Sequence, residues 1–171
     1  MDIFTPFAYS GKDDPISNIN NQIPPECTNM SVTSKLTIAL LKSFHGKGYH
    51  LYIDNWYSSV PLLRYLLQQQ TICTSTSRST QVPKILKARK VAKGSTSSDV
   101  SRKLLAQKYE DKNKVYMLTT AERADTVTKQ KPGGHEKILP RSIDSYNQNM
   151  GGVDCIDPLL EPYDATRKIV R

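Results

Sequence analysis

The 171-residue sequence lacks several features that would place it in a common class of protein. No stretch approaches the roughly 18 consecutive apolar residues that a membrane-spanning helix requires. The opening residues, MDIFTPFAYSGKDD, contain neither the basic segment nor the apolar segment of a secretory signal peptide. The three cysteines, Cys27, Cys73 and Cys155, form no CxxC pair and no Cys/His cluster. These absences predict a soluble intracellular protein with reduced cysteines and no zinc site.

What the sequence has instead is an excess of positive charge. The net charge is +8 and the pI is about 9.4, which favours polyanionic partners such as nucleic acid, although many basic proteins never bind DNA. One segment, residues 78–93, holds six cations and no acidic residue. We expect it to be either a solvated loop or a phosphate-contacting one. Its cations are Arg78, Lys84, Lys87, Arg89, Lys90 and Lys93.

The first half of the chain alternates between helical and extended patterns. Residues 3–9 are expected to form a strand, and residues 13–29 a loop. Apolar residues then recur at helical spacing after Ser31 or Ser34, either of which could cap a helix that ends at Gly46 or Gly48. Residues 49–53 form a compact run of strand-forming side chains, and Ser58 or Ser59 could cap a second helix that begins near Pro61. This helix–strand–helix order predicts an α/β fold.

The second half is more polar. From Thr71 to Ser98 the composition shifts to Ser, Thr, Lys and Arg. Within it, the basic run 78–93 with Gly94 is similar in composition to a flexible DNA-tracking segment. Residues 115–120 predict a strand, and residues 123–137 a loop that turns at Gly133-Gly134. A second glycine pair, Gly151-Gly152, is expected to open the last segment.

Three aspartates are candidates for metal chemistry. Asp54 directly follows the expected strand 49–53, where side chains of an open α/β sheet reach a ligand-binding crevice. Asp154 and Asp157 are three residues apart, so on a helix both lie on one face. Hard cations such as Mg²⁺ prefer carboxylate oxygens, and a cation offsets the repulsion between two carboxylates. The structural alternatives are a turn or cap role for Asp54, and a helix N-terminus for Asp154 and Asp157.

Other chemically active residues have structural interpretations. His45, His50 and His135 show no spacing typical of a metal site or a catalytic triad, so they are expected to be ordinary surface or loop residues. Trp56 and Tyr57, beside Asp54, are expected to lie in the core or to line a crevice. Stacking on a nucleic-acid base is the alternative.

Two segments taken together resemble the piggyBac-type transposases. Residues 51–63, LYIDNWYSSVPLL, are similar to the strand–turn–helix of that family, and residues 146–168, YNQNMGGVDCIDPLLEPYDATRK, are similar to its YN-x-x-MGGVD-x-x-D segment and the basic pair that follows. Residues 108–120, KYEDKNKVYMLTT, and residues 7–12, FAYSGK, resemble further strands of the family in the same order. The resemblance therefore extends over nearly the whole chain.

The resemblance implies an α/β fold: an incomplete ribonuclease-H-like core interrupted by a β-rich, basic insertion. Residues 1–74 and 141–171 would form the core, and residues 75–140 the insertion. Asp54 and Asp154 match the second and third catalytic aspartates, and Asp157 matches an additional acid; together they would bind Mg²⁺ or Mn²⁺. Transposon-end DNA, a homodimer in the full-length family, nuclear localisation and no membrane association are also implied. The expected DNA-binding residues are Arg78, Lys84, Lys87, Arg89, Lys90, Lys93, Arg167 and Lys168.

The sequence also departs from the family pattern. The family's first catalytic aspartate lies about a dozen residues before the strand that FAYSGK resembles, and counting back from Tyr9 passes Met1. The family's Gly-Thr-x-Arg and Arg-Lys-Gly elements are replaced by residues 74–82, TSTSRSTQV. We therefore expect weak or absent metal binding and no DNA cutting or joining by this chain alone. A non-catalytic DNA-binding module and a nuclease completed by another polypeptide are the alternatives.

Overall fold

A computed structural model describes residues 23–130 and 136–154, and the chain divides into two compact units, residues 1–43 and 44–171. In the first unit, a short 3₁₀ helix, η2 (Pro25–Cys27), precedes helix α1 (Val32–Leu41). Of the two serines expected to cap α1, Ser31 does so, because its hydroxyl accepts a hydrogen bond from the Ser34 amide. The expected strand 3–9 lies outside the described residues, and the expected loop 13–29 contains η2.

Helix α1 ends earlier than its pattern indicates. The 3₁₀ helix η3 (Lys42–Phe44) follows it directly, and Gly46 and Gly48 come only afterwards, both with positive φ. These two glycines therefore turn the chain toward the next strand, a conformation that glycine adopts at little cost.

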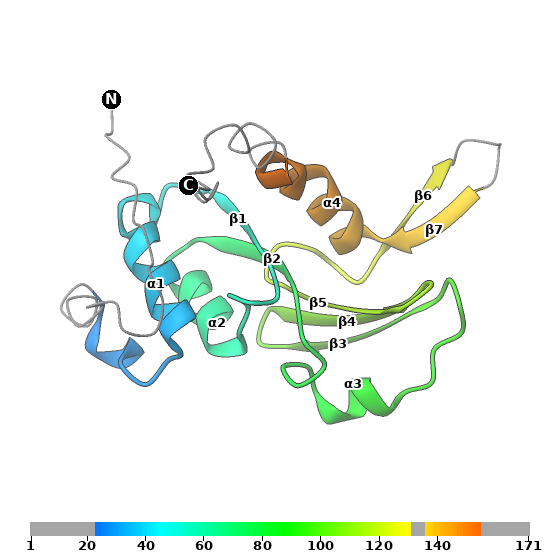
Figure 1. Cartoon of the computed structure of the whole chain (residues 1–171), viewed down its shortest axis with the longest axis horizontal. Helices are drawn as coiled ribbons and strands as arrows, with labels where there is room; N and C mark the ends of the chain where they lie inside the picture. The colour runs from blue at the N-terminus through cyan, green and yellow to red at the C-terminus, as the bar shows by residue number, and fades with distance from the viewer. Residues whose placement is uncertain (1–22, 131–135, 155–171) are drawn as a thin grey trace, which may run out of the picture. The chain divides into compact units, whose positions relative to one another are not determined.

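The second unit contains a mixed five-stranded sheet in the order β1-β2-β5-β4-β3, with one parallel pair, β1–β2, and antiparallel pairs elsewhere (Figure 1). A separate antiparallel hairpin is formed by β6 and β7. The elements of this unit are β1 (His50–Ile53), α2 (Val60–Gln68), β2 (Ile72–Thr76), α3 (Lys84–Ala88), β3 (Thr96–Ser101), β4 (Leu104–Glu110), β5 (Lys114–Thr119), β6 (Thr126–Gln130), β7 (Glu136–Pro140) and α4 (Arg141–Asp154).

Helices cover both faces of the sheet in this unit. Helix α4 packs against β1, β2 and β5, whereas α2 packs against β2, and α3 packs against β3 and β4 (Figure 1). The register separates the two faces, because side chains of paired residues in neighbouring strands point the same way. Leu118 of β5 pairs with both Ser75 and Ala106, and Thr119 with both Thr74 and Leu105. The Leu118 row faces α2, and the Thr119 row faces α4.

Helix α2 confirms its expected pattern. Ser59 caps it by accepting a hydrogen bond from the Leu62 amide, and a proline stands in its first turn. Leu62, Leu63 and Leu66 are fully buried, while Leu67 is half-buried. Burial of these side chains against the sheet is the main source of stability for so short a helix.

Several elements differ from the sequence expectation. Residues 71–98, for which only a change of composition was noted, contain β2, α3 and part of β3. Residues 126–130 and 136–137, expected as loop, belong to β6 and β7. The expected turn at Gly133-Gly134 lies outside the described residues. The polar stretch after Pro140 forms α4, and Gly151-Gly152 lies inside this helix instead of opening a new segment.

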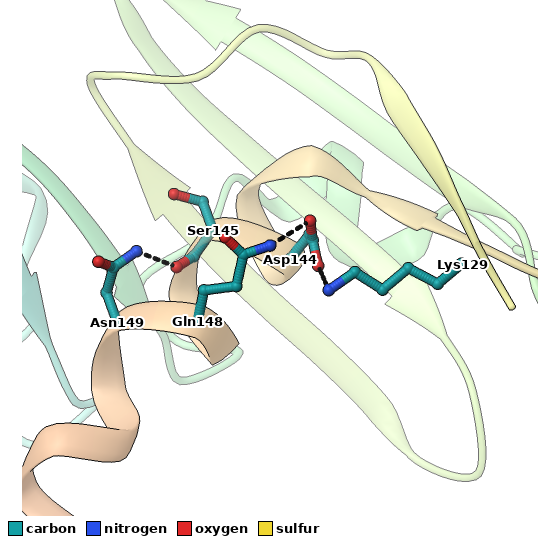
Figure 2. Close-up of polar contacts among 5 residues, drawn as sticks. All are labelled: Lys129, Asp144, Ser145, Gln148 and Asn149. Atoms are coloured by element: carbon teal, nitrogen blue, oxygen red, sulfur yellow. Dashed lines mark hydrogen bonds and ion pairs between the residues drawn. The ribbon is translucent and has the colours of Figure 1, made fainter. Parts of the chain in front are cut away.

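Helix α4 is tied to the β6–β7 hairpin by an ion pair. Lys129 of β6 contacts the carboxylate of Asp144, which also accepts a hydrogen bond from Gln148 at 2.9 Å (Figure 2). One residue further along the helix, the Asn149 side-chain amide donates to the Ser145 carbonyl at 2.7 Å (Figure 2). Together these bonds stabilise polar turns that have little apolar surface of their own.

A two-residue turn joins β3 to β4. Ser101 pairs with Leu104, so only Arg102 and Lys103 form the turn, with φ angles of 49° and 65°. Both therefore have left-handed backbone conformations, as a type I′ hairpin turn requires.

Candidate nucleic-acid and metal site at the end of strand β1

Asp54 lies where the sequence predicts it, immediately after β1. Its backbone carbonyl accepts hydrogen bonds from the amides of Tyr57 and Ser58, at 3.1 and 3.2 Å. Its carboxylate is exposed and accepts a hydrogen bond of 2.9 Å from the Thr76 hydroxyl at the end of β2. The turn role and the ligand role are therefore compatible, because the backbone forms the turn and leaves the carboxylate accessible to a cation.

Asp154 is the last residue of α4, and Asp157 lies outside the described residues. The helix N-terminus interpretation is wrong for Asp154, because α4 begins at Arg141. Asp144 is the acidic residue of its first turn. Among the described residues, no three His, Cys, Asp or Glu side chains gather as a metal-binding group.

A polar network connects α4 to the strand that leads to Asp54. The Tyr52 hydroxyl lies 2.8 Å from the Ser145 hydroxyl of α4 and 3.0 Å from His50 Nδ1. On the other side of the imidazole, His50 Nε2 lies 2.9 Å from Thr74 Oγ1, which contacts Thr119 Oγ1 at 2.7 Å. The imidazole also stacks on the Tyr52 ring, with centroids 4.1 Å apart. His50 is therefore a half-buried network residue, and its assignment as a surface or loop residue was wrong.

His45 lies in the turn between η3 and β1, as expected of a loop residue, and it is half-buried. Its Nδ1 lies 3.4 Å from Thr71 Oγ1, and its ring packs edge-on against Tyr65 at 5.9 Å. Burial lowers its pKa. His135 lies outside the described residues.

The environment of His50 makes stability depend on pH. Burial lowers the pKa of His50 below its ordinary value, and the Glu122 carboxylate opposes this with a smaller effect. Because the unfolded chain then binds the proton more readily than the folded chain, the contribution of neutral His50 to the free energy of unfolding is fully present above the unfolded pKa of about 6.5. This contribution is lost as the pH falls below that value. We expect the urea concentration at the unfolding midpoint to decrease as the pH is lowered from about 8 to about 5, and to decrease less in His50→Gln.

The matched variant for this experiment is His45→Gln. It removes the other described histidine whose pKa burial lowers, and it leaves the His50 contribution in place. An unchanged pH dependence in His50→Gln would show that the network does not set the protonation of this imidazole.

The basic segment is ordered and not a plain solvated loop. Lys84 and Lys87 belong to α3, and the Arg89 guanidinium donates hydrogen bonds to Ser97 Oγ and to the Ser98 carbonyl, at 3.2 and 2.9 Å. All six cations of this segment are exposed, so a phosphate contact remains open to them. Arg167 and Lys168 lie outside the described residues.

The buried lysine that organises this segment was not found from the sequence. Lys108 of β4 is only 4% exposed, and its ammonium donates to the carbonyls of Lys87 and Arg89, at 3.1 and 2.6 Å. These carbonyls belong to the last turn of α3 and its C-terminal cap, where a cation is favoured. No local pattern signals this contact, because a lysine in a strand is normally expected to face solvent.

The aromatic residues after Asp54 are not in the core. Trp56 is 61% exposed and Tyr57 is 38% exposed, so their assignment to the core was wrong. The guanidinium carbon of Arg78 lies 4.9 Å from the centre of the Trp56 ring, within cation–π range.

Both described cysteines are free and buried. Burial raises the pKa of the Cys73 thiol to about 12, and it also raises that of Cys27. Cys155 lies outside the described residues. No helix in the described part of the chain has the length and apolar character to cross a membrane.

Comparison with known proteins assigns this chain to a class. A DDE family model described as Transposase IS4 matches residues 16–170, and the chain belongs to this transposase family. One solved structure, the cryo-EM structure of the piggyBac transposase synaptic complex with hairpin DNA, is similar to this chain, with a TM-score of 0.65 and 26% sequence identity. The match covers 78% of this chain and 28% of that chain. The resemblance to piggyBac-type transposases is therefore confirmed, and the chain corresponds to a little over a quarter of that relative's length.

Proposed function

We propose that this chain acts on DNA as part of the catalytic region of a piggyBac-type transposase. The observation that carries the proposal is the position of Asp54: an exposed carboxylate at the end of β1, in a turn hydrogen-bonded to the neighbouring strand β2, in a chain of a DDE transposase family. The substrate would be transposon-end DNA, the location the nucleus, and the working form of the full-length protein a homodimer. The similar piggyBac transposase complex contains hairpin DNA, which supports the choice of substrate.

The fold supports a ribonuclease-H-like core. β1, α2 and β2 form a parallel β-α-β unit with Asp54 at the end of its first strand. In open α/β sheets, ligands bind beyond such carboxyl ends of strands. Within this proposal, residues 1–74 and 141–171 belong to the core and residues 75–140 to the insertion, whose strands β3, β4 and β5 continue the same sheet.

The proposed donors are carboxylates, which suit Mg²⁺ or Mn²⁺. Asp54 supplies the carboxylate oxygen that these cations prefer, and Asp154 and Asp157 are the proposed further ligands. When bound in a pair, such ions activate the attacking oxygen and stabilise the leaving oxygen of a phosphodiester. We propose that the 171-residue polypeptide, which matches 28% of the similar transposase chain, binds the cation weakly and neither cuts nor joins DNA alone.

Replacing Asp54 tests the metal role. Asp54→Asn keeps the size of the side chain but removes its charge, so we expect at least a tenfold weaker affinity for Mn²⁺. Mn²⁺ binding is measured by the relaxation of water protons. Asp99→Asn is the matched control, because Asp99 lies in β3, the edge strand opposite β1 in the sheet. Equal Mn²⁺ affinities of the parent chain and Asp54→Asn would refute the role of Asp54.

The same preparation tests the lack of catalysis. A supercoiled plasmid incubated with the chain and Mn²⁺ is expected to remain intact. If the parent chain nicked the plasmid and Asp54→Asn did not, the proposal of inactivity would be wrong and the chain would be an active nuclease.

A non-catalytic DNA-binding module is the second candidate, favoured by the exposed cations Lys84, Lys87, Lys90 and Lys93. Such a module would bind a short duplex with an affinity that falls steeply as salt rises, because phosphate contacts release counterions. Duplex binding without a Mn²⁺ site at Asp54 would favour this candidate over the first.

A further inference from the structure

The turn that follows β1, residues 54–58, is held at both ends. At its start, the Asp54 carboxylate accepts a hydrogen bond from Thr76, and at its end the buried Ser58 hydroxyl lies 2.8 Å from Ser75 Oγ. Both partners belong to β2. The Asp54 carbonyl closes the turn by accepting two backbone amides. Because the ends are fixed to the sheet, the residues between them have little freedom to collapse onto the protein surface.

The largest side chain of this turn is strongly exposed. Trp56 leaves 61% of its surface in water although an indole is strongly favoured in apolar surroundings. Arg78, two residues beyond the end of β2, lies over the ring at 4.9 Å from its centre. The result is a flat aromatic surface that carries a cation and remains accessible to solvent.

The chemistry around Trp56 selects the kind of partner. Its exposed sequence neighbours Asp54 and Asn55 are charged or polar, and the cation of Arg78 adjoins the ring. An apolar protein surface or a lipid tail would remove water from these groups. A nucleotide suits the ring and the cation instead, since its base has a π face for the indole and its phosphate carries a negative charge for the guanidinium. The net charge of +8 favours the same polyanion.

We propose that Trp56 and Arg78 form a stacking site for one unpaired nucleotide of DNA, next to Asp54. The proposal rests on the proposed action on DNA and adds to it the conformation of the strand. A base within a duplex already stacks on both faces, so the indole can receive only a base that is single-stranded, terminal or turned out of the helix. The site thus selects distorted or single-stranded DNA beside the candidate metal ligand.

The chain offers a direct readout, because Trp56 is its only tryptophan. Stacking of a base on the indole is expected to quench its fluorescence. The probe is an oligothymidylate of eight nucleotides, compared with a strand of equal charge whose central positions are abasic. We expect the thymidylate to quench the emission and the abasic strand to leave it largely unchanged. In fluorescence anisotropy, Trp56→Leu should bind the thymidylate about tenfold more weakly than the parent.

Three further variants separate stacking from charge and from folding. Trp56→Phe retains an aromatic face and should recover most of the affinity lost in Trp56→Leu. Arg78→Gln should weaken binding of both strands, because it removes a charge. Ile85→Ser is the matched control, since Ile85 is an apolar residue exposed to a similar extent (68%). Circular dichroism checks that each variant is folded.

The proposal is overturned if the thymidylate binds without quenching Trp56, or if Trp56→Leu binds it as tightly as the parent chain. It is also overturned if no single-stranded probe binds. The Mn²⁺ measurement on Asp54→Asn is independent of these outcomes, so failure of the stacking site and failure of the metal role can be told apart.

Discussion

Replacement of Leu118 by alanine is expected to lower the free energy of unfolding by about 3 kcal/mol. Leu118 is fully buried in β5, the middle strand of the five-stranded sheet, and it lies in register with Ser75 and Ala106. Its neighbours in this row are small, so no adjacent side chain in the row can expand to fill the space. The loss is a large fraction of the roughly 5–15 kcal/mol that stabilises a typical domain. Urea denaturation followed by circular dichroism measures it.

Ile85→Ala is the matched control for Leu118→Ala. It also shortens a branched aliphatic side chain, but Ile85 is 68% exposed in α3, so the change in stability should stay within about 0.5 kcal/mol. A loss below about 1 kcal/mol in Leu118→Ala would show that the middle of this sheet is not closely packed.

Replacement of Lys108 by methionine is expected to cost about 2 kcal/mol and to disorder α3. Methionine keeps most of the side-chain volume, but it removes the ammonium that satisfies the Lys87 and Arg89 carbonyls, and hydrogen bonds to charged groups are the stronger ones. Helix α3 has five residues and no side-chain cap at its N-terminus, so it cannot persist without tertiary contacts. Hydrogen exchange should therefore accelerate at the Lys87 and Arg89 amides, which are hydrogen-bonded within α3.

Lys114→Met provides the control for Lys108→Met, because Lys114 is exposed in β5. It removes the same charge without removing a buried donor, so exchange within α3 should not change. If Lys108→Met left the α3 amides as protected as in the parent chain, the two carbonyls would have to be satisfied by another donor. The position of the basic segment would then not depend on Lys108.

Local patterns predicted the elements that bury a clear apolar face. Helix α2 was recognisable from its serine cap and its leucines, and β1 and β5 from their strand-forming residues. Strand β2 was missed because its ICTST sequence is rich in hydroxyl groups. Those hydroxyls are buried only because partners distant in sequence satisfy them, such as Thr119 for Thr74 and Ser58 for Ser75. Composition cannot indicate such pairings.

The candidate site was likewise predicted only in part. The position of Asp54 followed from the strand before it, since a carboxylate directly after a β-run is visible in sequence. The contact between Trp56 and Arg78 joins residues 22 positions apart (78 − 56), and the Lys108 contact with the carbonyls of α3 depends on the pairing of strands. Helix α4 was not predicted, because its composition is polar and it contains a glycine pair. The ion pair that stabilises it comes from Lys129 of another element, which no local pattern indicates.

The tip of the β3–β4 hairpin places two long cationic side chains on a backbone shape that suits asparagine and glycine. Arg102 and Lys103 both have positive φ, which costs an ordinary side chain on the order of 1 kcal/mol at each position. An Asn-Gly pair would relax the loop and reduce the number of Lys and Arg residues by two. An Asn-Gly turn would therefore be less strained but would carry no charge. Arg102 and Lys103 keep two positive charges at this tip despite the strain.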